Sequence, residues 1–256
     1  MLAAEASLLN IELVILDVGR DAPAKQVLGN IEHIDGSFTD PVKIRELASR
    51  VNILTVEIEH VNVDVLDEIQ STSKIIIHPS PSTIRTIQDK YVQKQHLRTH
   101  GCPLSNYIEV PPTKAGVEGA IAALGLPLML KSRTLAYDGR GNFALKGPSQ
   151  VDEALAFLAN RPLYAEKWVP FEREIAVMVV RSVSGQVRSY PAVETVHKDN
   201  ICHLVFAPLR VADATVATRA REVAERAVAT LSGPGVFGVE MFLMESGKFL
   251  LIRLTR

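Results

Sequence analysis

The pattern of hydrophobic and polar residues changes near residue 80 of this 256-residue chain. Before that point, runs rich in β-branched residues alternate with segments of helical period, which predicts a parallel sheet built from strand–helix–strand units. Such sheets usually open with a strand and a glycine-rich turn, whereas this chain begins inside a helix, so we expect the first strand to be missing. The predicted strands are IELVILDV (11–18), HIDGSF (33–38), NILTVEIEHV (52–61) and KIIIHP (74–79), and the helices cover 1–10, 40–51 and 63–70.

After residue 80 the pattern predicts an α+β unit with antiparallel strands. The segment HPSPST (78–83) interrupts the alternation and marks the boundary, which gives domains at 1–80 and 81–256. The second domain divides into a small lobe of about 90–165 and a large lobe of 166–256. Its predicted helices are 80–101, 114–124, 149–160 and 213–231, and its strands are 105–110, 127–132, 142–146, 162–169, 174–182, 187–196, 235–244 and 248–254.

The composition narrows the partners of this protein. Lys and Arg number 28 against 29 Asp and Glu, and aromatic residues make up 5%, so neither a nucleic acid nor a membrane surface is an expected partner. No apolar run approaches the ~18 residues of a membrane-spanning helix. Cys102 and Cys202 are isolated, which is typical of reduced thiols, and the N-terminus does not resemble a signal peptide. We therefore expect a cytoplasmic protein.

The segment SRTLAYDGRGNF (132–143) directly follows a predicted strand that ends in Lys131. Its glycines would let backbone N–H groups approach a phosphate, and the lysine could reach the same phosphate as a point charge. The Asp-Gly and Arg-Gly pairs are equally suited to a plain β-hairpin turn. The residues alone leave both interpretations open.

Three glutamates downstream also allow two interpretations. Glu166 and Glu174 flank a strand-to-turn transition and would suit an adenine hinge with a ribose-binding carboxylate, or would simply be solvated surface residues. Glu240 lies in the apolar strand GVEMFLM and needs a partner, either a divalent cation or a buried salt bridge. His197 is either an ordinary surface histidine or part of the same site.

The order of these residues resembles that of ATP-grasp enzymes, in which two α+β lobes close on one nucleotide. No GxxxxGK[ST], complete GxGxxG, nucleophile elbow or HExxH motif points elsewhere. The chain most closely resembles the N5-carboxyaminoimidazole ribonucleotide synthase family, which forms the N-terminal half of fungal phosphoribosylaminoimidazole carboxylase. The resemblance is carried by IQDKYVQKQHLRTHGCP, LPLMLKSRTLAYDGRGNF, RPLYAEKWVPFERE, YPAVETVHKDNICH and GVFGVEMFLM.

The resemblance implies a role for each matching residue. Lys131 and Arg140 would be catalytic, Glu240 would bind Mg²⁺, and the ribonucleotide would contact Glu57, Tyr137, Asp138 and Arg140. ATP would contact Lys90, Lys131, Ala136, Tyr137, Asp138, Gly139, Arg140, Gly141, Asn142, Glu166, Lys167, Trp168, Val169, Glu174 and His197.

The family joins 5-aminoimidazole ribonucleotide to bicarbonate at the expense of ATP in purine (IMP) biosynthesis, through carboxyphosphate. Carboxyphosphate hydrolyses in water, so the loop at 136–142 is expected to act as a lid. Family members are commonly dimeric, and fungal members carry a separate mutase domain that is absent here.

Two departures from the family suggest a chain truncated at both ends. The first strand and its glycine-rich turn are absent, and FLLIRLTR stands where the family continues with an Asn-Glu pair, so the second metal-binding glutamate is missing. A metal site with one carboxylate leaves Mg²⁺ under-liganded. The alternatives to an active carboxylase are a catalytically inactive nucleotide-binding fragment and another ATP-grasp ligase, such as a biotin carboxylase-like subunit. AYDGRGNF and YPAVETVHKDN argue against the second of these.

Overall fold

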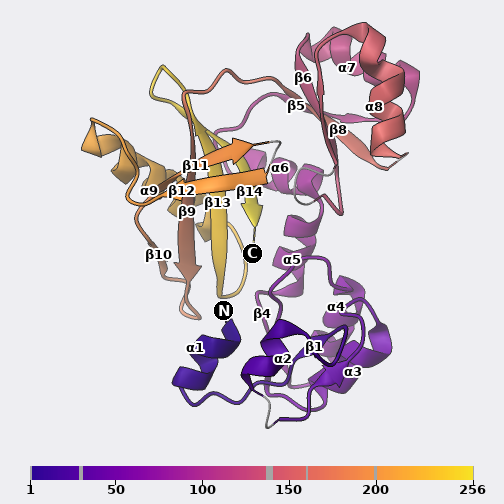
Figure 1. Cartoon of the computed structure of the whole chain (residues 1–256), viewed down its shortest axis with the longest axis vertical. Helices are drawn as coiled ribbons and strands as arrows, with labels where there is room; N and C mark the ends of the chain where they lie inside the picture. The colour runs from indigo at the N-terminus through magenta and orange to yellow at the C-terminus, as the bar shows by residue number, and fades with distance from the viewer. Residues whose placement is uncertain (1, 29–30, 137–140, 160, 199–200, 256) are drawn as a thin grey trace. The chain divides into compact units, whose positions relative to one another are not determined.

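The computed structural model describes residues 2–28, 31–136, 141–159, 161–198 and 201–255. The chain divides into two compact units at residues 85 and 86, and α5 (Pro81–Gln88) runs across the division (Figure 1). Within the described ranges, no helix has the length and apolar character needed to cross a membrane.

The first unit is built from short strands and the helices between them. β1 pairs with β2 and β3 pairs with β4, and both pairs are parallel, as predicted. Asp40 begins α3 as predicted, because its carboxylate accepts a hydrogen bond from the Val42 N–H at 2.8 Å. The elements are α1 (Leu2–Leu8), β1 (Leu16–Asp17), α2 (Pro23–Val27), β2 (Ile34–Asp35), α3 (Pro41–Ala48), β3 (Ile53–Thr55), α4 (Val63–Thr72) and β4 (Ile76–His78).

The strands of the first unit are shorter than predicted. The run 11–18 was expected to be a buried strand, but only Leu16–Asp17 pairs, and Ile11 is 52% exposed. The segment 52–61 is likewise reduced to Ile53–Thr55. A β-branched run becomes a strand only along the length for which a neighbour offers its N–H and C=O groups, and each described pair here has two or three registered residues. The parallel arrangement is therefore confirmed, but as two separate pairs among the described residues.

The second unit contains a small four-stranded sheet in the order β5-β8-β6-β7. α7 and α8 cover one face of it (Figure 1), where they pack on alternate residues such as Leu128 and Leu130. Lys131 directly follows Leu130 on the same strand and therefore points to the other face. The elements are β5 (Tyr107–Val110), α7 (Lys114–Leu124), β6 (Leu128–Ser132), β7 (Asn142–Leu145), a 3₁₀ turn (Pro148–Gln150), α8 (Val151–Leu158) and β8 (Leu163–Lys167).

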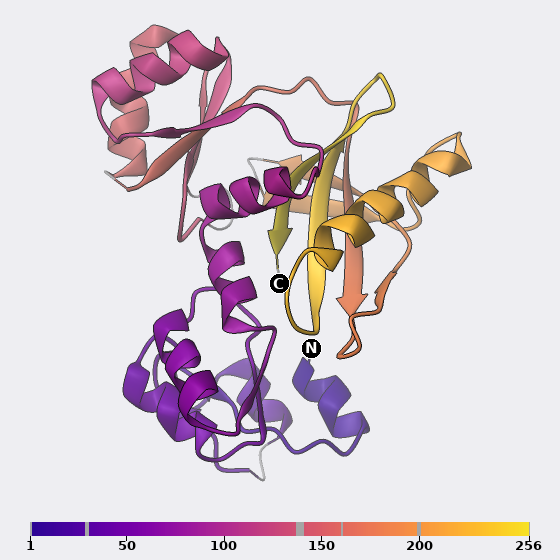
Figure 2. The same cartoon turned by 180° about the vertical axis from the view of Figure 1, so that it is seen from behind.

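The larger sheet of this unit is antiparallel, with the strand order β12-β11-β9-β13-β14 and β10 paired to β9. α9 packs across its back (Figure 2) against Val177, Phe237 and Val239, each of which is fully buried. The elements are α6 (Lys90–Thr99), β9 (Arg173–Arg181), β10 (Val187–Ser189), β11 (Val193–Lys198), β12 (Ile201–Phe206), α9 (Ala214–Ala229), β13 (Gly235–Leu243) and β14 (Phe249–Thr255). β12 was not predicted, because most of its side chains are exposed and supply no apolar alternation.

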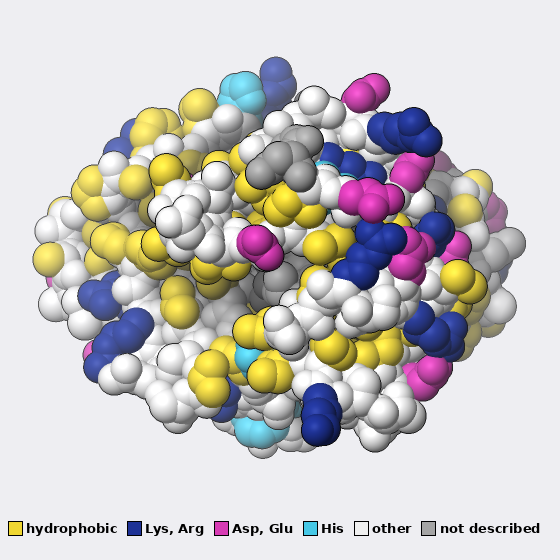
Figure 3. All heavy atoms as spheres, turned by 90° about the horizontal axis from the view of Figure 1, so that it is seen from below, with side chains coloured by type: hydrophobic (Ala, Val, Ile, Leu, Met, Phe, Trp, Pro, Cys, Tyr) yellow, Lys and Arg dark blue, Asp and Glu magenta, His cyan; other side chains and the backbone are white. Residues whose placement is uncertain are grey.

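The surface agrees with the nearly balanced composition. On the face drawn in Figure 3, Lys and Arg side chains lie beside Asp and Glu side chains, and neither sign forms a continuous field. This mixed arrangement does not resemble the basic stripe of a nucleic-acid-binding surface.

Candidate functional site

A cavity of about 550 Å³ lies between the two sheets of the second unit. This volume is in the range of small-molecule sites. Its described lining consists of Lys90, Ser105, Met129, Lys131, Ala136, Asn142, Tyr164, Glu166, Lys167, Trp168, Val169, Phe171, Glu174, Thr195, His197, Ile201, Cys202, Glu240, Phe242, Ile252 and Arg253.

Strand alternation explains why polar residues face this cavity. In β13, Phe237, Val239 and Met241 are buried against α9, so Glu240 and Phe242 point to the opposite face. The large sheet therefore presents its apolar face to α9 and its mixed face to the cavity. The small sheet does the same, with α7 and α8 on its apolar side.

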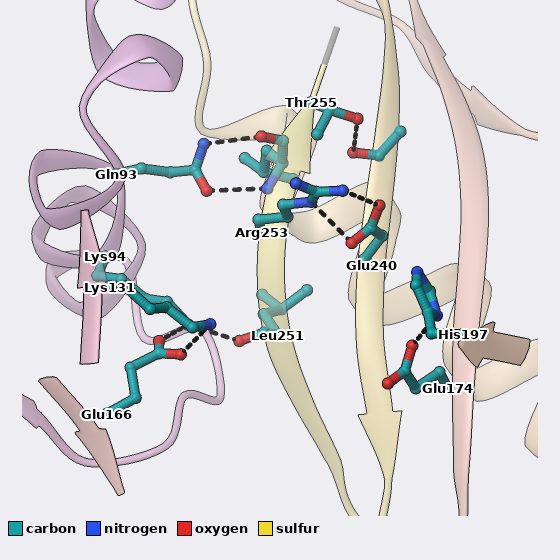
Figure 4. Close-up of polar contacts among 12 residues, drawn as sticks. Gln93, Lys94, Lys131, Glu166, Glu174, His197, Glu240, Leu251, Arg253 and Thr255 are labelled. Carbon is teal, nitrogen blue, oxygen red and sulfur yellow. Dashed lines mark hydrogen bonds and ion pairs between the residues drawn. The ribbon is translucent and has the colours of Figure 1, made fainter. Parts of the chain in front are cut away.

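Glu166, which lines the cavity, is held between two lysines (Figure 4). Its Oε2 accepts from Lys131 Nζ at 2.6 Å, and its Oε1 forms an ion pair with Lys94 Nζ at 2.5 Å. Lys94 also donates to the Leu251 carbonyl of β14 at 3.0 Å. The side chains of Lys94 and Glu166 are 1% and 8% exposed, so the interpretation of Glu166 as a solvated surface residue is wrong. This cluster links α6, both sheets and the cavity.

The charge state of Glu166 follows from this arrangement. Burial alone would raise its pKa, but the ammonium groups of Lys131 and Lys94 together outweigh burial and lower the pKa from 4.5 to about 2. Glu166 is therefore ionised at neutral pH and fixes the position of the Lys131 ammonium in the cavity.

This low pKa predicts how stability changes in acid. A carboxyl group whose pKa is lower in the folded state stabilises the fold fully above its unfolded-state pKa. The contribution of Glu166 should therefore be lost as pH falls from about 4.5 to about 2. Urea unfolding followed by Trp168 fluorescence should show this decline, and Glu166→Gln should flatten it while lowering stability at neutral pH. Glu118→Gln, which changes an exposed carboxylate on α7, should retain the wild-type slope.

Glu174 and His197 form a second pair in the cavity (Figure 4). The carboxylate of Glu174 on β9 contacts Nδ1 of His197 on β11. Burial raises the pKa of Glu174, the nearby His197 opposes this, and the nearby Glu240 adds to it. His197 is consequently not an ordinary surface histidine, because its ring is fixed by a partly buried carboxylate.

Glu240 pairs with Arg253 on the neighbouring strand (Figure 4). Arg253 Nε donates to Oε2 at 2.8 Å and Nη2 donates to Oε1 at 2.9 Å, which is a bidentate arrangement. Of the two partners considered for Glu240, the structure therefore contains the salt bridge. No group of three or more His, Cys, Asp or Glu residues suited to a metal ion occurs in the described part of the chain.

The segment after Lys131 is a hairpin between β6 and β7. Its described residues Ala136 and Asn142 line the cavity. Gly141 has φ +92°, and a Cβ added there would lie 2.9 Å from the Ala136 Cβ, so a larger residue at this point would disturb the turn. The hairpin and a phosphate-covering role are thus compatible, because Ala136 and Asn142, on either side of the turn, line the cavity.

The structure brings most of the predicted site residues together. Gly141 does not line the cavity but closes the hairpin through its carbonyl, which accepts from the Ser132 N–H at 2.7 Å. Glu57 is exposed in the first unit and is not part of the cavity lining. Tyr137, Asp138, Gly139 and Arg140 lie outside the described residues. The predicted residues that line the cavity are Lys90, Lys131, Ala136, Asn142, Glu166, Lys167, Trp168, Val169, Glu174, His197 and Glu240.

The sequence interpretation missed two charged residues of the site. Lys94 lies one helical turn after Lys90 in a polar helix, so its burial had no signature in the pattern. The sequence pattern did contain a signal for Arg253, because this residue interrupts the apolar strand FLLIRL just as Glu240 interrupts GVEMFLM. Opposite charges in two neighbouring apolar strands suggest a cross-strand pair.

The fold and the site define a two-lobed α/β protein whose sheets enclose a cavity lined by lysines and glutamates. The chain belongs to the ATP-grasp family, because the ATP-grasp domain matches residues 95–254. The ribonucleotide synthetase preATP-grasp domain matches residues 1–88. The predicted fold class is therefore confirmed.

Comparison with individual proteins confirms the predicted resemblance. Phosphoribosylaminoimidazole carboxylase of Ogataea methanolica is 54% identical over 251 residues, which are 98% of this chain and 46% of that protein. The crystal structure of carboxyaminoimidazole ribonucleotide synthase from Aspergillus clavatus complexed with ATP matches with a TM-score of 0.94 and 45% identity, over 99% of this chain and 66% of that one. A second structure from that species, in complex with ADP and 5-aminoimidazole ribonucleotide, has a TM-score of 0.93 and 43% identity, with the same coverage. The chain spans about half the length of the curated carboxylases that it matches.

Proposed function

We propose that this chain binds ATP in the cavity between its two sheets and serves the ATP-dependent carboxylation of 5-aminoimidazole ribonucleotide with bicarbonate. The observation that carries the proposal is the convergence of Lys131, Glu166 and the β6–β7 hairpin on one cavity of about 550 Å³. The relatives from Aspergillus clavatus, complexed with ATP or with ADP and the ribonucleotide, support it.

The hinge at Lys167–Val169 would receive the adenine. The N–H groups of Lys167 and Trp168 already donate to Asn106 and Pro127 carbonyls at 2.8 and 3.3 Å. Pairing with the adenine edge is therefore assigned to the backbone at Val169. The ribose would contact Glu174, whose carboxylate is oriented by His197.

The proposed reaction has two steps. A bicarbonate oxygen attacks the γ-phosphorus of ATP, the bond to the ADP oxygen breaks, and carboxyphosphate forms. The exocyclic amine of the ribonucleotide then attacks the carboxyl carbon, or CO₂ released from it, and inorganic phosphate and a proton leave. Phosphoryl transfer depends on placing positive charge around the moving oxygens. Lys131, held by Glu166, and Lys90 supply that charge in this chain, and the hairpin would exclude water.

Mg²⁺ is the metal that the resemblance implies, and when bound it would neutralise phosphate charge. The described residues do not fit a resident Mg²⁺ site. Mg²⁺ favours carboxylate oxygens that are available to it, whereas both oxygens of Glu240 accept hydrogen bonds from Arg253. No step is therefore assigned to the metal.

Trp168 provides the first test, because it is the single tryptophan of the chain and lines the cavity. Titration with ATP should change its fluorescence saturably, whereas GTP should bind at least tenfold more weakly because the hinge fits an adenine edge. A folded sample whose fluorescence does not respond to ATP would contradict the proposal. The second test is ADP release that depends on 5-aminoimidazole ribonucleotide and bicarbonate.

The Arg253–Glu240 pair favours a second candidate, a nucleotide-binding chain that does not catalyse the reaction. This candidate predicts saturable ATP binding without any ADP release that depends on the ribonucleotide. A homodimer and a fused mutase domain stay predictions from the resemblance, and sedimentation velocity would test the first of them.

A further inference from the structure

Arg253 reaches Glu240 because of an irregularity in β14. Glu240 registers with Arg253, but the next residue, Met241, registers with Leu251, so β14 carries one extra residue at this point. Such a bulge shifts which side chains face each side of a sheet. Leu251 and Leu254 stay in the core, 1% and 2% exposed, while Arg253 is placed opposite Glu240 on the cavity side.

Each of the three carboxylates of the described cavity lining contacts a basic side chain of the protein. Glu166 contacts Lys94 and Lys131, Glu174 contacts His197, and Glu240 contacts Arg253. A divalent cation entering the cavity would have to displace one of these partners. At Glu240 the competitor is a bidentate guanidinium, whose two bonds to the carboxylate are 2.8 and 2.9 Å long.

We propose that Arg253 takes the place of a divalent cation in this cavity, so that its guanidinium neutralises Glu240 and contacts the nucleotide phosphates. This inference rests on the proposed binding of ATP. A guanidinium has five N–H donors in a planar fork that matches phosphate oxygens as well as carboxylates. The Arg253 side chain is 37% exposed and lines the cavity, so an incoming phosphate can reach it. The consequence is nucleotide binding that depends little on Mg²⁺.

The direct test compares ATP affinity of the wild-type chain in EDTA and in Mg²⁺, measured by Trp168 fluorescence. We expect the two dissociation constants to agree within about threefold. Arg253→Gln should weaken binding in EDTA by about 10- to 100-fold, the range for loss of hydrogen bonds to a charged group. Mg²⁺ should restore part of that loss, because Glu240 is then available to the metal.

Arg210→Gln is the matched control. Arg210 binds Glu194 with the same bidentate geometry, at 3.1 Å for both bonds, but neither residue lines the cavity. The Arg210→Gln variant should bind ATP with the affinity of the wild-type chain, both in EDTA and in Mg²⁺. Electron paramagnetic resonance of Mn²⁺ with ADP gives an independent readout: Arg253→Gln should bind more Mn²⁺ than the wild-type chain at the same degree of saturation with ADP.

The outcomes separate this inference from the proposed function. ATP binding by the wild-type chain that requires Mg²⁺ would overturn the role of Arg253 and leave the proposed function standing. Absence of ATP binding in both buffers would overturn both. The comparison of buffers needs no variant, so the inference can be tested even if Arg253→Gln does not fold.

Discussion

Replacement of Lys94 by methionine is expected to lower the free energy of unfolding of the second unit by about 3 kcal/mol, the lower end for breaking a buried ion pair. Methionine retains most of the lysine stem, so the loss is that of the charge and its hydrogen bond rather than of packing. Glu166 keeps Lys131, but its Oε1 loses its cation and the Leu251 carbonyl loses its donor. The loss should be visible as a lower urea midpoint in Trp168 fluorescence.

Lys114→Met is the matched control for this prediction. Lys114 pairs with Asp152 at 3.4 Å, and its side chain is 60% exposed, so its removal should change stability by less than about 0.5 kcal/mol. Equal effects of the two substitutions would show that the buried cluster does not stabilise the unit. The neighbouring Gln93, whose amide exchanges two 2.9 Å hydrogen bonds with the backbone of Leu254, should hold α6 against β14 in both variants.

Replacement of Lys131 by methionine should weaken ATP binding by about 100-fold, which corresponds to about 2.7 kcal/mol. The described lining contains four cationic side chains, from Lys90, Lys131, Lys167 and Arg253, against three glutamates. Loss of Lys131 removes this small excess of positive charge and leaves Glu166 paired with Lys94 alone, so a polyphosphate would lose a cation of the cavity lining. Titration of Trp168 fluorescence with ATP measures the effect.

Two further variants make this prediction specific. Lys146→Met removes an exposed lysine just beyond β7 and should bind ATP like the wild-type chain. Lys131→Arg keeps the charge but changes the shape of the donor, and should lose about tenfold. If Lys131→Met is folded by circular dichroism and binds ATP within threefold of the wild-type chain, Lys131 does not contact the phosphates.

The sequence predicted the elements well wherever local chemistry decides them. The Asp40 cap and Pro41 begin α3, and Gly101, with φ +69°, follows the end of α6. The alternation in 235–244 and 248–254 predicted the last two strands, whose apolar residues need only a covering helix. These features depend on neighbouring residues in the chain, so periodicity and capping rules are sufficient.

Strand length in the first unit could not be predicted in this way. The run 11–18 has the composition of a strand over its whole length, but hydrogen bonds to a neighbouring strand decide how much of it is one. The pattern of hydrophobic residues describes one strand and does not show where the neighbouring strand begins or ends.

The sequence by itself determined most of the order of helices and strands, apart from elements such as α2 and β12, and most of the polar residues that line the cavity. Only the tertiary structure decided that Glu166 lies buried between Lys94 and Lys131, and that Arg253 lies opposite Glu240. The physical reason is that the partner of a buried charge comes from another element, 72 residues away for Lys94 and Glu166, and a single extra residue in β14 changes which side chain faces the carboxylate.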